Sequence, residues 1–191
     1  YHHMGLKERM PQFELAAPQN GNLVAEETEK QIIVKSGELR IEIEKESGAF
    51  VFWRGAEKIT GSGWRDLAYM KTNWKGSAYD KGPEDAYMRE QLSISVGELV
   101  YGLGERFSAF VKNGQSVDIW NEDGGTCTEI SYKNIPFYMT NKGYGIYVDH
   151  TDNVSFEVAS EKVEYVGFSV PGEELKYCFI YGPTPKEILN A

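Results

Sequence analysis

The sequence predicts an all-β protein, built as an antiparallel β-sandwich or a β-barrel. Short apolar runs recur along the chain, and turn residues separate them at close intervals. A signal for a helix is found only at the end of the chain. With 191 residues, of which 41% are hydrophobic and 13% aromatic, the chain is long enough to bury a sizeable core.

The first clear strand lies at residues 39–44, which read LRIEIE. Apolar and charged residues alternate there, and a period of two places one face of a strand in a core and the other in water. Shorter apolar runs at 32–34 and 49–53 flank this strand, each across a Ser-Gly turn. We therefore expect a meander to open the folded domain.

The segment before the meander has a different character. Residues 1–30 are mostly polar, with two prolines and little periodicity, so we expect them to lie outside the sandwich. Tyr1-His2-His3-Met4 looks like the remnant of an expression tag. We expect the rest to be an extended, partly disordered lead-in.

Residues 55–85 are rich in glycine, and we expect irregular loops there around one strand at 66–70. Trp64 and Trp74 lie in this region. Their rings have two possible uses, which are to close the open end of a sandwich or to stack on a sugar ring. Packing is the favoured interpretation, because aromatic rings carry much of the burial in any core.

A hairpin is predicted in the middle of the chain. The runs at 107–111 and 116–120 flank Asn113-Gly114, and Asn-Gly between two such runs is a strong hairpin signal. This hairpin would carry an acidic, glycine-rich tip, NEDGGT, at 121–126. The tip is not an EF-hand calcium loop. With Gly124 in the glycine position, the first and last ligand positions fall on isoleucines.

The remaining strand patterns surround this hairpin. They lie at 88–96, 137–140, 144–149, 153–159, 163–170 and 174–181. Thr184 and Pro185 then carry the signals of a helix start, as N-cap and first helical residue. The sequence stops at Ala191, barely a turn later, from which we expect a boundary inside a longer protein.

The charge of the chain excludes several kinds of partner. A net charge of -9 and an isoelectric point of about 4.9 argue against nucleic acid and against an anionic membrane surface. No apolar run has the roughly 20 residues that a membrane span needs. We expect neither partner.

The cysteines and possible metal ligands suggest a cytoplasmic protein without a cofactor. Cys127 and Cys178 form no disulfide framework or zinc pattern, and are expected to be reduced thiols. The polar cluster of Asp149, His150 and Asp152 allows a metal site, but a solvated turn is the favoured interpretation, because the spacing gives no evident ligand geometry.

Catalytic machinery cannot be identified from the residues alone. His150 is the only histidine outside the presumed tag, so no Ser-His-Asp arrangement is evident. A pair of catalytic carboxylates cannot be selected among 29 acidic residues. The chemistry of the residues therefore leaves the reaction open.

Five motifs in order and spacing resemble the N-terminal β-sandwich domain of glycoside hydrolase family 31, and within it the bacterial α-xylosidases. The resemblance is dense over residues 86–191 and loose over 31–70. The motifs are YGLGER at 101–106, WNEDGGT at 120–126, YKNIPFYMT at 132–140, GYGIYV at 143–148 and GPTPKEIL at 182–189.

The resemblance implies a galactose-mutarotase-like antiparallel β-sandwich at residues 31–182. Residues 183–191 would begin a helix that links to a catalytic β/α barrel beyond this sequence. Members of the family are retaining α-glycosidases whose nucleophile and general acid are aspartates on that barrel. The resemblance therefore implies no catalytic residue in this chain. The implied partners are the barrel and an α-linked xylosyl or glucosyl oligosaccharide.

The resemblance also implies one substrate-binding residue, Asp123, on a loop over the barrel mouth. A carboxylate suits this role because it accepts charge-assisted hydrogen bonds from sugar hydroxyls. Family members often have a basic residue just before this aspartate, where this chain has Glu122. The extra negative charge leaves the preferred leaving-group sugar open.

Two alternatives stay open beside an N-terminal enzyme domain. One is a free-standing carbohydrate-binding module, and the other is a mutarotase-like enzyme on a similar sandwich, for which no acid-base residues can be assigned. The family domain is also longer at its N-terminus than this chain. If first strands of the sandwich are missing, uncovered edges would favour a homo-oligomer.

Overall fold

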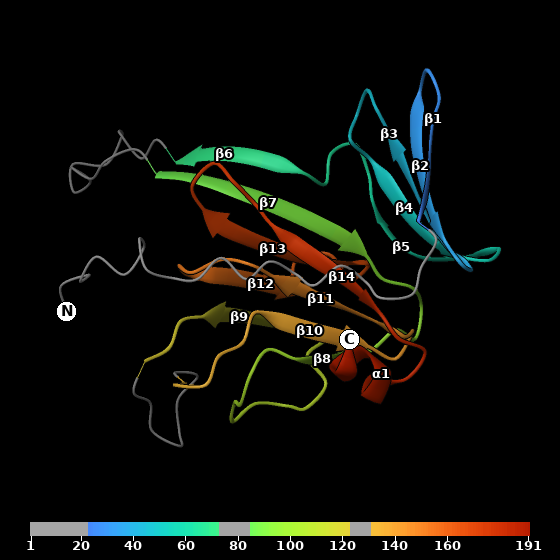
Figure 1. Cartoon of the computed structure of the whole chain (residues 1–191). Coiled ribbons are helices and arrows are strands. Elements are labelled where there is room, and N and C mark those ends of the chain that lie inside the picture. Colours follow the sequence, from blue (N-terminus) through green and yellow to red (C-terminus); the bar gives the residue numbers. More distant parts are fainter. Residues whose placement is uncertain (1–22, 73–84, 123–130) are drawn as a thin grey trace, which may run out of the picture.

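The computed structural model of the chain describes residues 23–72, 85–122 and 131–191. These residues form three antiparallel sheets and one short helix near the C-terminus (Figure 1). The predicted all-β sandwich is confirmed. Residues 1–22 lie outside the described part, so the predicted tag remnant and most of the lead-in stay predictions.

The first sheet is a five-stranded meander in which each strand pairs with the next. Apolar residues share one face of it because the register aligns Ile41 with Val34 on one side and with Phe52 on the other. The strands are β1 (Val24–Glu27), β2 (Gln31–Ser36), β3 (Leu39–Glu44), β4 (Phe50–Arg54) and β5 (Glu57–Ser62).

The other two sheets are assembled from strands that are distant in sequence. One has the order β6-β7-β13-β12-β9 and the other the order β14-β11-β10-β8. The strands are β6 (Ala68–Thr72), β7 (Asp85–Ser93), β8 (Val100–Gly102), β9 (Gln115–Ile119), β10 (Phe137–Thr140), β11 (Tyr144–Val148), β12 (Val154–Val158), β13 (Tyr165–Pro171) and β14 (Tyr177–Tyr181).

The hydrophobic core lies between these two sheets. Alternate residues of β12 and β13 are buried, as the period of two requires for strands with one face in the core. Rings from the two sheets meet edge to face, with centroids 6.2 Å apart for Tyr138 and Phe156 and 5.2 Å apart for Phe168 and Tyr177. This geometry suits the quadrupoles of aromatic rings and adds to the stabilisation from burial.

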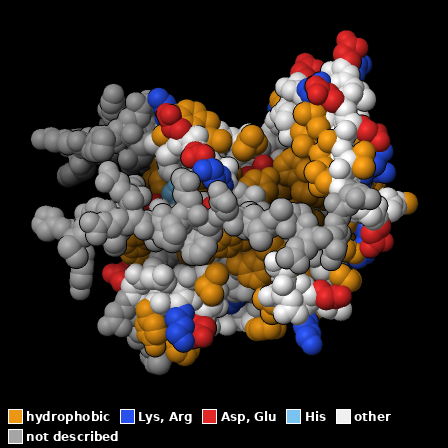
Figure 2. Space-filling view, viewed as in Figure 1, with side chains coloured by type: hydrophobic (Ala, Val, Ile, Leu, Met, Phe, Trp, Pro, Cys, Tyr) orange, Lys and Arg blue, Asp and Glu red, His pale blue; other side chains and the backbone are white. Residues whose placement is uncertain are grey.

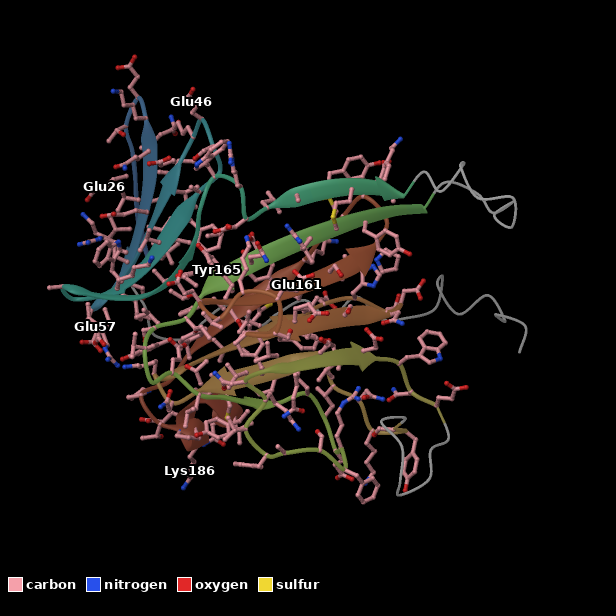
Figure 3. The ribbon with its side chains drawn as sticks, turned by 180° about the vertical axis from the view of Figure 1, so that it is seen from behind. Glu26, Glu46, Glu57, Glu161, Tyr165 and Lys186 are labelled. Atoms are coloured by element: carbon pink, nitrogen blue, oxygen red, sulfur yellow. The ribbon has the colours of Figure 1, made fainter. Side chains whose placement is uncertain are left out.

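The meander sheet is joined to this core along one side. Phe52 stacks on Phe179 of β14, with ring centroids 3.8 Å apart. The Thr60 hydroxyl donates a 2.7 Å hydrogen bond to the carbonyl oxygen of Ser93 on β7. Figure 2 shows hydrophobic side chains where this sheet meets the rest of the molecule and charged side chains at its far edge. Figure 3 shows Glu26 and Glu46 at the same outer margin.

Among the described residues, the glutamates Glu90 and Glu98 are buried, each 2% exposed. The Tyr144 hydroxyl donates to Glu98 Oε1 over 2.6 Å, and the Ser62 hydroxyl donates to Glu90 Oε1 over 2.6 Å. Tyr177 also donates to Glu90, over 3.3 Å. Burial raises the pKa of Glu90 above its ordinary value, because it disfavours the charged carboxylate.

The C-terminal helix confirms the predicted start signals. Helix α1 (Pro185–Asn190) has Thr184 as its N-cap and Pro185 in its first turn. The Thr184 hydroxyl oxygen accepts a hydrogen bond from the backbone N–H of Glu187, which satisfies one donor that the helix leaves unpaired. Ile188 is buried against the sandwich, at 2% exposed. The helix is therefore packed against the domain.

The sequence analysis missed several strands. β1 lies within the segment expected to be an extended lead-in, and it pairs with β2 as an edge strand. β5 lies where irregular loops were expected, and β6 begins two residues later than the predicted strand at 66–70. These strands lack clear alternation, so their pairing partners rather than their own pattern define them.

The predicted hairpin at 107–120 is wrong. Residues 103–114 form no strand, and Phe107 and Phe110 are exposed. Gly114 does turn the chain with a φ of +83°, but the strand that follows it, β9, pairs with β12. A tight Asn-Gly turn is therefore present without the local strand pairing that usually accompanies it.

Candidate functional site

The candidate site is the base of the segment that contains the predicted tip. Strand β9 ends at Ile119, and Trp120, Asn121 and Glu122 follow it at the surface. The described chain resumes at Ser131. Asp123 and the rest of residues 123–130 lie outside the described residues, so the role of Asp123 stays a prediction.

The two ends of this segment are held together at its base. The backbone N–H of Glu122 donates to the carbonyl oxygen of Ser131 over 3.0 Å. Asn121 and Ser131 also form an isolated parallel β-bridge. The residues on either side of 123–130 are therefore neighbours in space.

The carboxamide of Asn134 bonds to the chain on both sides of residues 123–130. Its Nδ2 donates to the carbonyl oxygen of Trp120 over 2.7 Å and to that of Ser131 over 2.6 Å. Its backbone N–H donates to Asn121 Oδ1 over 2.7 Å. The residue is 7% exposed, so these bonds are largely shielded from competing water.

Arg106 completes the arrangement from the YGLGER motif. Its Nη2 donates to Asn134 Oδ1 and to the carbonyl oxygen of Asp118, and its Nε donates to the carbonyl oxygen of Leu103 over 3.3 Å. The sequence left a ligand role and a structural role open for Arg106, and these bonds support the structural one. We call Arg106, Asn121 and Asn134 the loop clamp.

The side chain of Glu105 contributes little to the stability of this region, although it lies in the YGLGER motif. It pairs with Lys133 across 3.1 Å, but both side chains are mostly exposed. Ion pairs of this kind contribute about 0 to 1 kcal/mol. The more informative contacts are those of its backbone, because its N–H donates to the carbonyl oxygen of Lys133 over 2.9 Å and its carbonyl oxygen accepts from Ser131 Oγ over 2.6 Å.

Two glycines explain why the YGLGER motif fits so closely here. Gly102 and Gly104 have φ angles of +113° and +85°, which favour glycine. A Cβ on Gly104 would lie 2.2 Å from the carbonyl oxygen of Lys133 and 2.8 Å from the Cα of Asn134. The motif therefore packs backbone against backbone on the segment that carries Asn134.

A buried lysine supports the neighbouring loop. Lys112 is 4% exposed, and its ammonium group donates to Ser108 Oγ over 2.9 Å and to the carbonyl oxygen of Ala109 over 2.8 Å. Burial, with a smaller contribution from the charge of Arg106, lowers the pKa of Lys112. Both of these side-chain hydrogen bonds lie within its own loop.

Exposed apolar side chains lie on the segments that the loop clamp joins. Their exposed fractions run from 45% for Trp120 to 78% for Phe110. The hydrogen bonds described above join the segments that carry these side chains. We call this set the aromatic surface, and its members are Phe107, Phe110, Trp120, Tyr132 and Ile135. Large exposed apolar patches mark interaction sites.

Other candidate residues lie elsewhere. Trp64 is 65% exposed, and the Arg65 guanidinium lies 4.1 Å from its ring centroid, so the predicted packing role is wrong for Trp64. Trp74 lies outside the described residues. His150 Nδ1 accepts a 3.1 Å hydrogen bond from the N–H of Asp152 within their turn.

The described residues hold neither a metal-binding cluster nor a helix suited to crossing a membrane. Among them, no group of three or more His, Cys, Asp or Glu residues is placed to hold a metal ion. None of the helices in the same part of the chain has the length and apolar character that a membrane crossing requires.

Sequence reasoning missed Asn134 as a site residue. It stood within the YKNIPFY motif, yet an asparagine between strands is usually a turn residue. Its partners lie up to 28 residues away in sequence, and this distance hides the contact from any local pattern. Conservation across relatives is the signal that would reveal it.

The chain has recognisable relatives. The family described as the glycosyl hydrolase 31 N-terminal galactose mutarotase-like domain matches residues 2–157. An α-xylosidase of Emericella nidulans is 44% identical over 99% of this chain and 26% of its own length. An α-xylosidase of Lactiplantibacillus pentosus is 42% identical over 98% of this chain and 24% of its own length.

Solved structures support the fold. The cycloalternan-forming enzyme of Listeria monocytogenes superimposes with a TM-score of 0.75 at 21% identity, over 94% of this chain and 17% of its own. At that identity the likeness concerns the fold alone. The chain spans about a quarter of the length of the two α-xylosidases above.

Proposed function

Because the chain belongs to the family of glycosyl hydrolase 31 N-terminal galactose mutarotase-like domains, we propose that it is the non-catalytic N-terminal domain of an α-glycosidase. The proposed enzyme is an α-xylosidase or an α-glucosidase. In it, the domain packs on a catalytic β/α barrel and supplies a loop that contacts the substrate. The barrel and an α-linked xylosyl or glucosyl oligosaccharide are its partners.

The observation that carries this proposal is the similarity to two α-xylosidases at 42% and 44% identity over nearly the whole chain. An α-glucosidase of Bacillus thermoamyloliquefaciens is 32% identical over 47% of the chain. The broader and stronger match favours xylosyl over glucosyl substrates. Each α-xylosidase has about three quarters of its length outside the match, and we place the catalytic aspartates there.

The buried carboxyl groups weigh against the mutarotase-like alternative. Such a reaction needs acid and base groups that reach a sugar. Glu90 and Glu98 are 2% exposed and are engaged by Ser62, Tyr177 and Tyr144 inside the sandwich. A sugar cannot reach them without opening the core.

We propose that Asp123 accepts a hydrogen bond from a substrate hydroxyl. Glu122, whose backbone is fixed by Ser131, is exposed immediately before it. The aromatic surface around the loop clamp is then the face that packs on the barrel. Exposed rings next to a substrate loop are suited to such a contact, because burying them stabilises the interface.

We also propose that the enzyme works in the cytoplasm and needs no cofactor or metal. The sequence has two widely separated cysteines and no disulfide framework, which suits a reducing compartment. The net charge of -9 supports a partner other than nucleic acid or an anionic membrane.

A carbohydrate-binding module is the second candidate, and exposed Trp64 favours it. Exposed tryptophan faces stack on sugar rings, although Arg65 already covers part of this ring. Under the first proposal the isolated chain holds half a site and binds free sugars weakly. Titration calorimetry with xylose, isoprimeverose or maltose should then show little heat, and micromolar binding that Trp64→Ala abolishes would support the module.

Activity of the isolated chain tests the main proposal. Purified residues 1–191 and the full-length protein are assayed with aryl α-xyloside and aryl α-glucoside, beside a mock preparation. We expect hydrolysis by the full-length protein alone. Hydrolysis by the isolated chain above the mock level would show that catalytic residues lie within it and would refute the proposal.

A further inference from the structure

We propose that Asn134 is a positioning residue that fixes the substrate-contacting loop by holding its two ends together. This inference rests on the proposed function for its effect on catalysis. The contacts behind it are all among described residues. Asn134 donates to the carbonyl oxygen of Trp120, the first residue after β9, and to that of Ser131, where the described chain resumes. Its own backbone is held by Asn121.

The carboxamide is the only side chain of its size that can make this set of bonds. Its Nδ2 supplies two donors, for Trp120 and Ser131, while its Oδ1 supplies the acceptor for Arg106. A carboxylate of the same shape has acceptors alone, and a hydroxyl has one donor. An isosteric change to aspartate would point an oxygen at two carbonyl oxygens.

The surroundings of Asn134 are rigid enough for it to act as a fixed point. Gly104 packs against its Cα with no room for a Cβ, and the Arg106 guanidinium reaches across from the same motif to Asp118 on β9. Asn134 is buried between these groups at 7% exposed. This frame fixes the positions of Glu122 and Ser131, and groups that contact a substrate must be held within a narrow tolerance for catalysis.

The test is Asn134→Asp in the full-length protein, with Asn141→Asp as the matched control. Asn141 also bridges backbone groups, since its Nδ2 donates to the carbonyl oxygen of Gly97 over 3.1 Å and its Oδ1 accepts from the N–H of Leu99 over 2.9 Å. Asn141 directly follows β10, whereas Asn134 precedes that strand. Both changes remove a donor and add a charge.

We expect Asn134→Asp to lower kcat/KM for a xylosyl disaccharide by about 10- to 100-fold, the loss that a displaced substrate contact produces. Asn141→Asp should stay within about twofold. In an Asp123→Asn background, Asn134→Asp should cause little further loss, because both changes remove the same contact. Equal effects of the two asparagine variants would overturn the inference. So would additive losses in the double variant, where Asp123→Asn alone already lowers kcat/KM.

Hydrogen exchange separates this inference from the proposed function. Exchange of the Glu122 amide, which donates to Ser131, should be faster in Asn134→Asp and unchanged in Asn141→Asp. Unchanged exchange in both would refute the positioning role whatever the kinetics show. If Asp123→Asn has no kinetic effect while exchange responds as expected, the substrate contact fails and the clamp stands.

A second variant covers the case in which Asn134→Asp does not fold. Asn121→Ala removes the acceptor for the Asn134 backbone from an exposed position, so the change should leave the core intact. We expect Asn121→Ala to lower kcat/KM and to speed exchange of the Glu122 amide, each by less than Asn134→Asp does. No change in either readout would contradict the inference.

Discussion

Replacing Gly104 by alanine tests the packing on which the site rests. Gly104 has a φ of +85°, and its missing Cβ faces three backbone atoms of the opposite segment. A methyl group would lie 2.2 Å from the Lys133 carbonyl oxygen and 2.9 Å from the Ile135 nitrogen. These atoms cannot move without displacing the segment that carries Asn134.

The expected loss of stability has two parts. A non-glycine residue held at positive φ costs about 1 to 3 kcal/mol. Overpacking against a fixed backbone costs about 1 to 3 kcal/mol more. The sum, about 2 to 6 kcal/mol, is a large share of the 5 to 15 kcal/mol that typically stabilises a domain. At about 2 to 4 °C per kcal/mol for a protein of this size, Tm should fall by about 4 to 24 °C.

Gly114→Ala is the matched control for this change. Gly114 has a φ of +83°, yet no atom lies within 4 Å of its missing Cβ. Backbone strain should therefore be the only source of lost stability in Gly114→Ala, at about 1 to 3 kcal/mol. Thermal unfolding of both variants by circular dichroism measures the difference. If the two variants lose the same Tm, close packing of Gly104 on the Asn134 segment is not what stabilises this region.

Two further predictions concern the rest of the molecule. Burial raises the pKa of Glu90, so its contribution to stability is full below the unfolded pKa near 4.5 and is lost as pH rises through the folded pKa. Glu90→Gln should therefore gain unfolding free energy relative to wild type as pH rises above 4.5, and denaturant titrations showing a constant difference would contradict this. Self-association is expected at high concentration, because β1 is an exposed edge strand and the aromatic surface is uncovered. Light scattering that reports a monomer at millimolar protein would count against it.

The strands that the sequence predicted well are those with a strong local pattern. LRIEIE at 39–44 has strict alternation and forms β3, and the hairpin of β10 and β11 has a clear turn between two apolar runs. In these cases the buried face is visible in the segment itself. The overall class followed from the repetition of such segments.

The strands that were missed depend on partners elsewhere in the chain. β5 reads EKITGS, and its Gly61 is needed because a Cβ there would lie 2.5 Å from the carbonyl oxygen of Phe50. The Asn113-Gly114 hairpin was wrong because β9 pairs with β12, whose residues lie about forty positions later. Local patterns carry no information about such a pairing.

The site was predicted in part. The motifs predicted a substrate-contacting loop at residues 121–126, and the structure shows how the described residues beside it are held. The bridging role of Asn134 could not be foreseen, because it depends on contacts with Trp120, Ser131 and Arg106 that only the fold brings together. The role of Asp123 follows from the resemblance and stays a prediction.

Substitution of Asp123 by asparagine in the full-length protein tests the central claim most directly. The lost charge-assisted hydrogen bond should contribute about 1.5 to 3 kcal/mol. At about 1.4 kcal/mol per tenfold, kcat/KM for a xylosyl disaccharide should fall by about 10- to 100-fold while Tm changes little. Asp149→Asn, an exposed aspartate after β11, serves as the control. Unchanged kinetics with a clear fall in Tm would contradict the account, because Asp123 would then stabilise its own turn and make no contact with substrate.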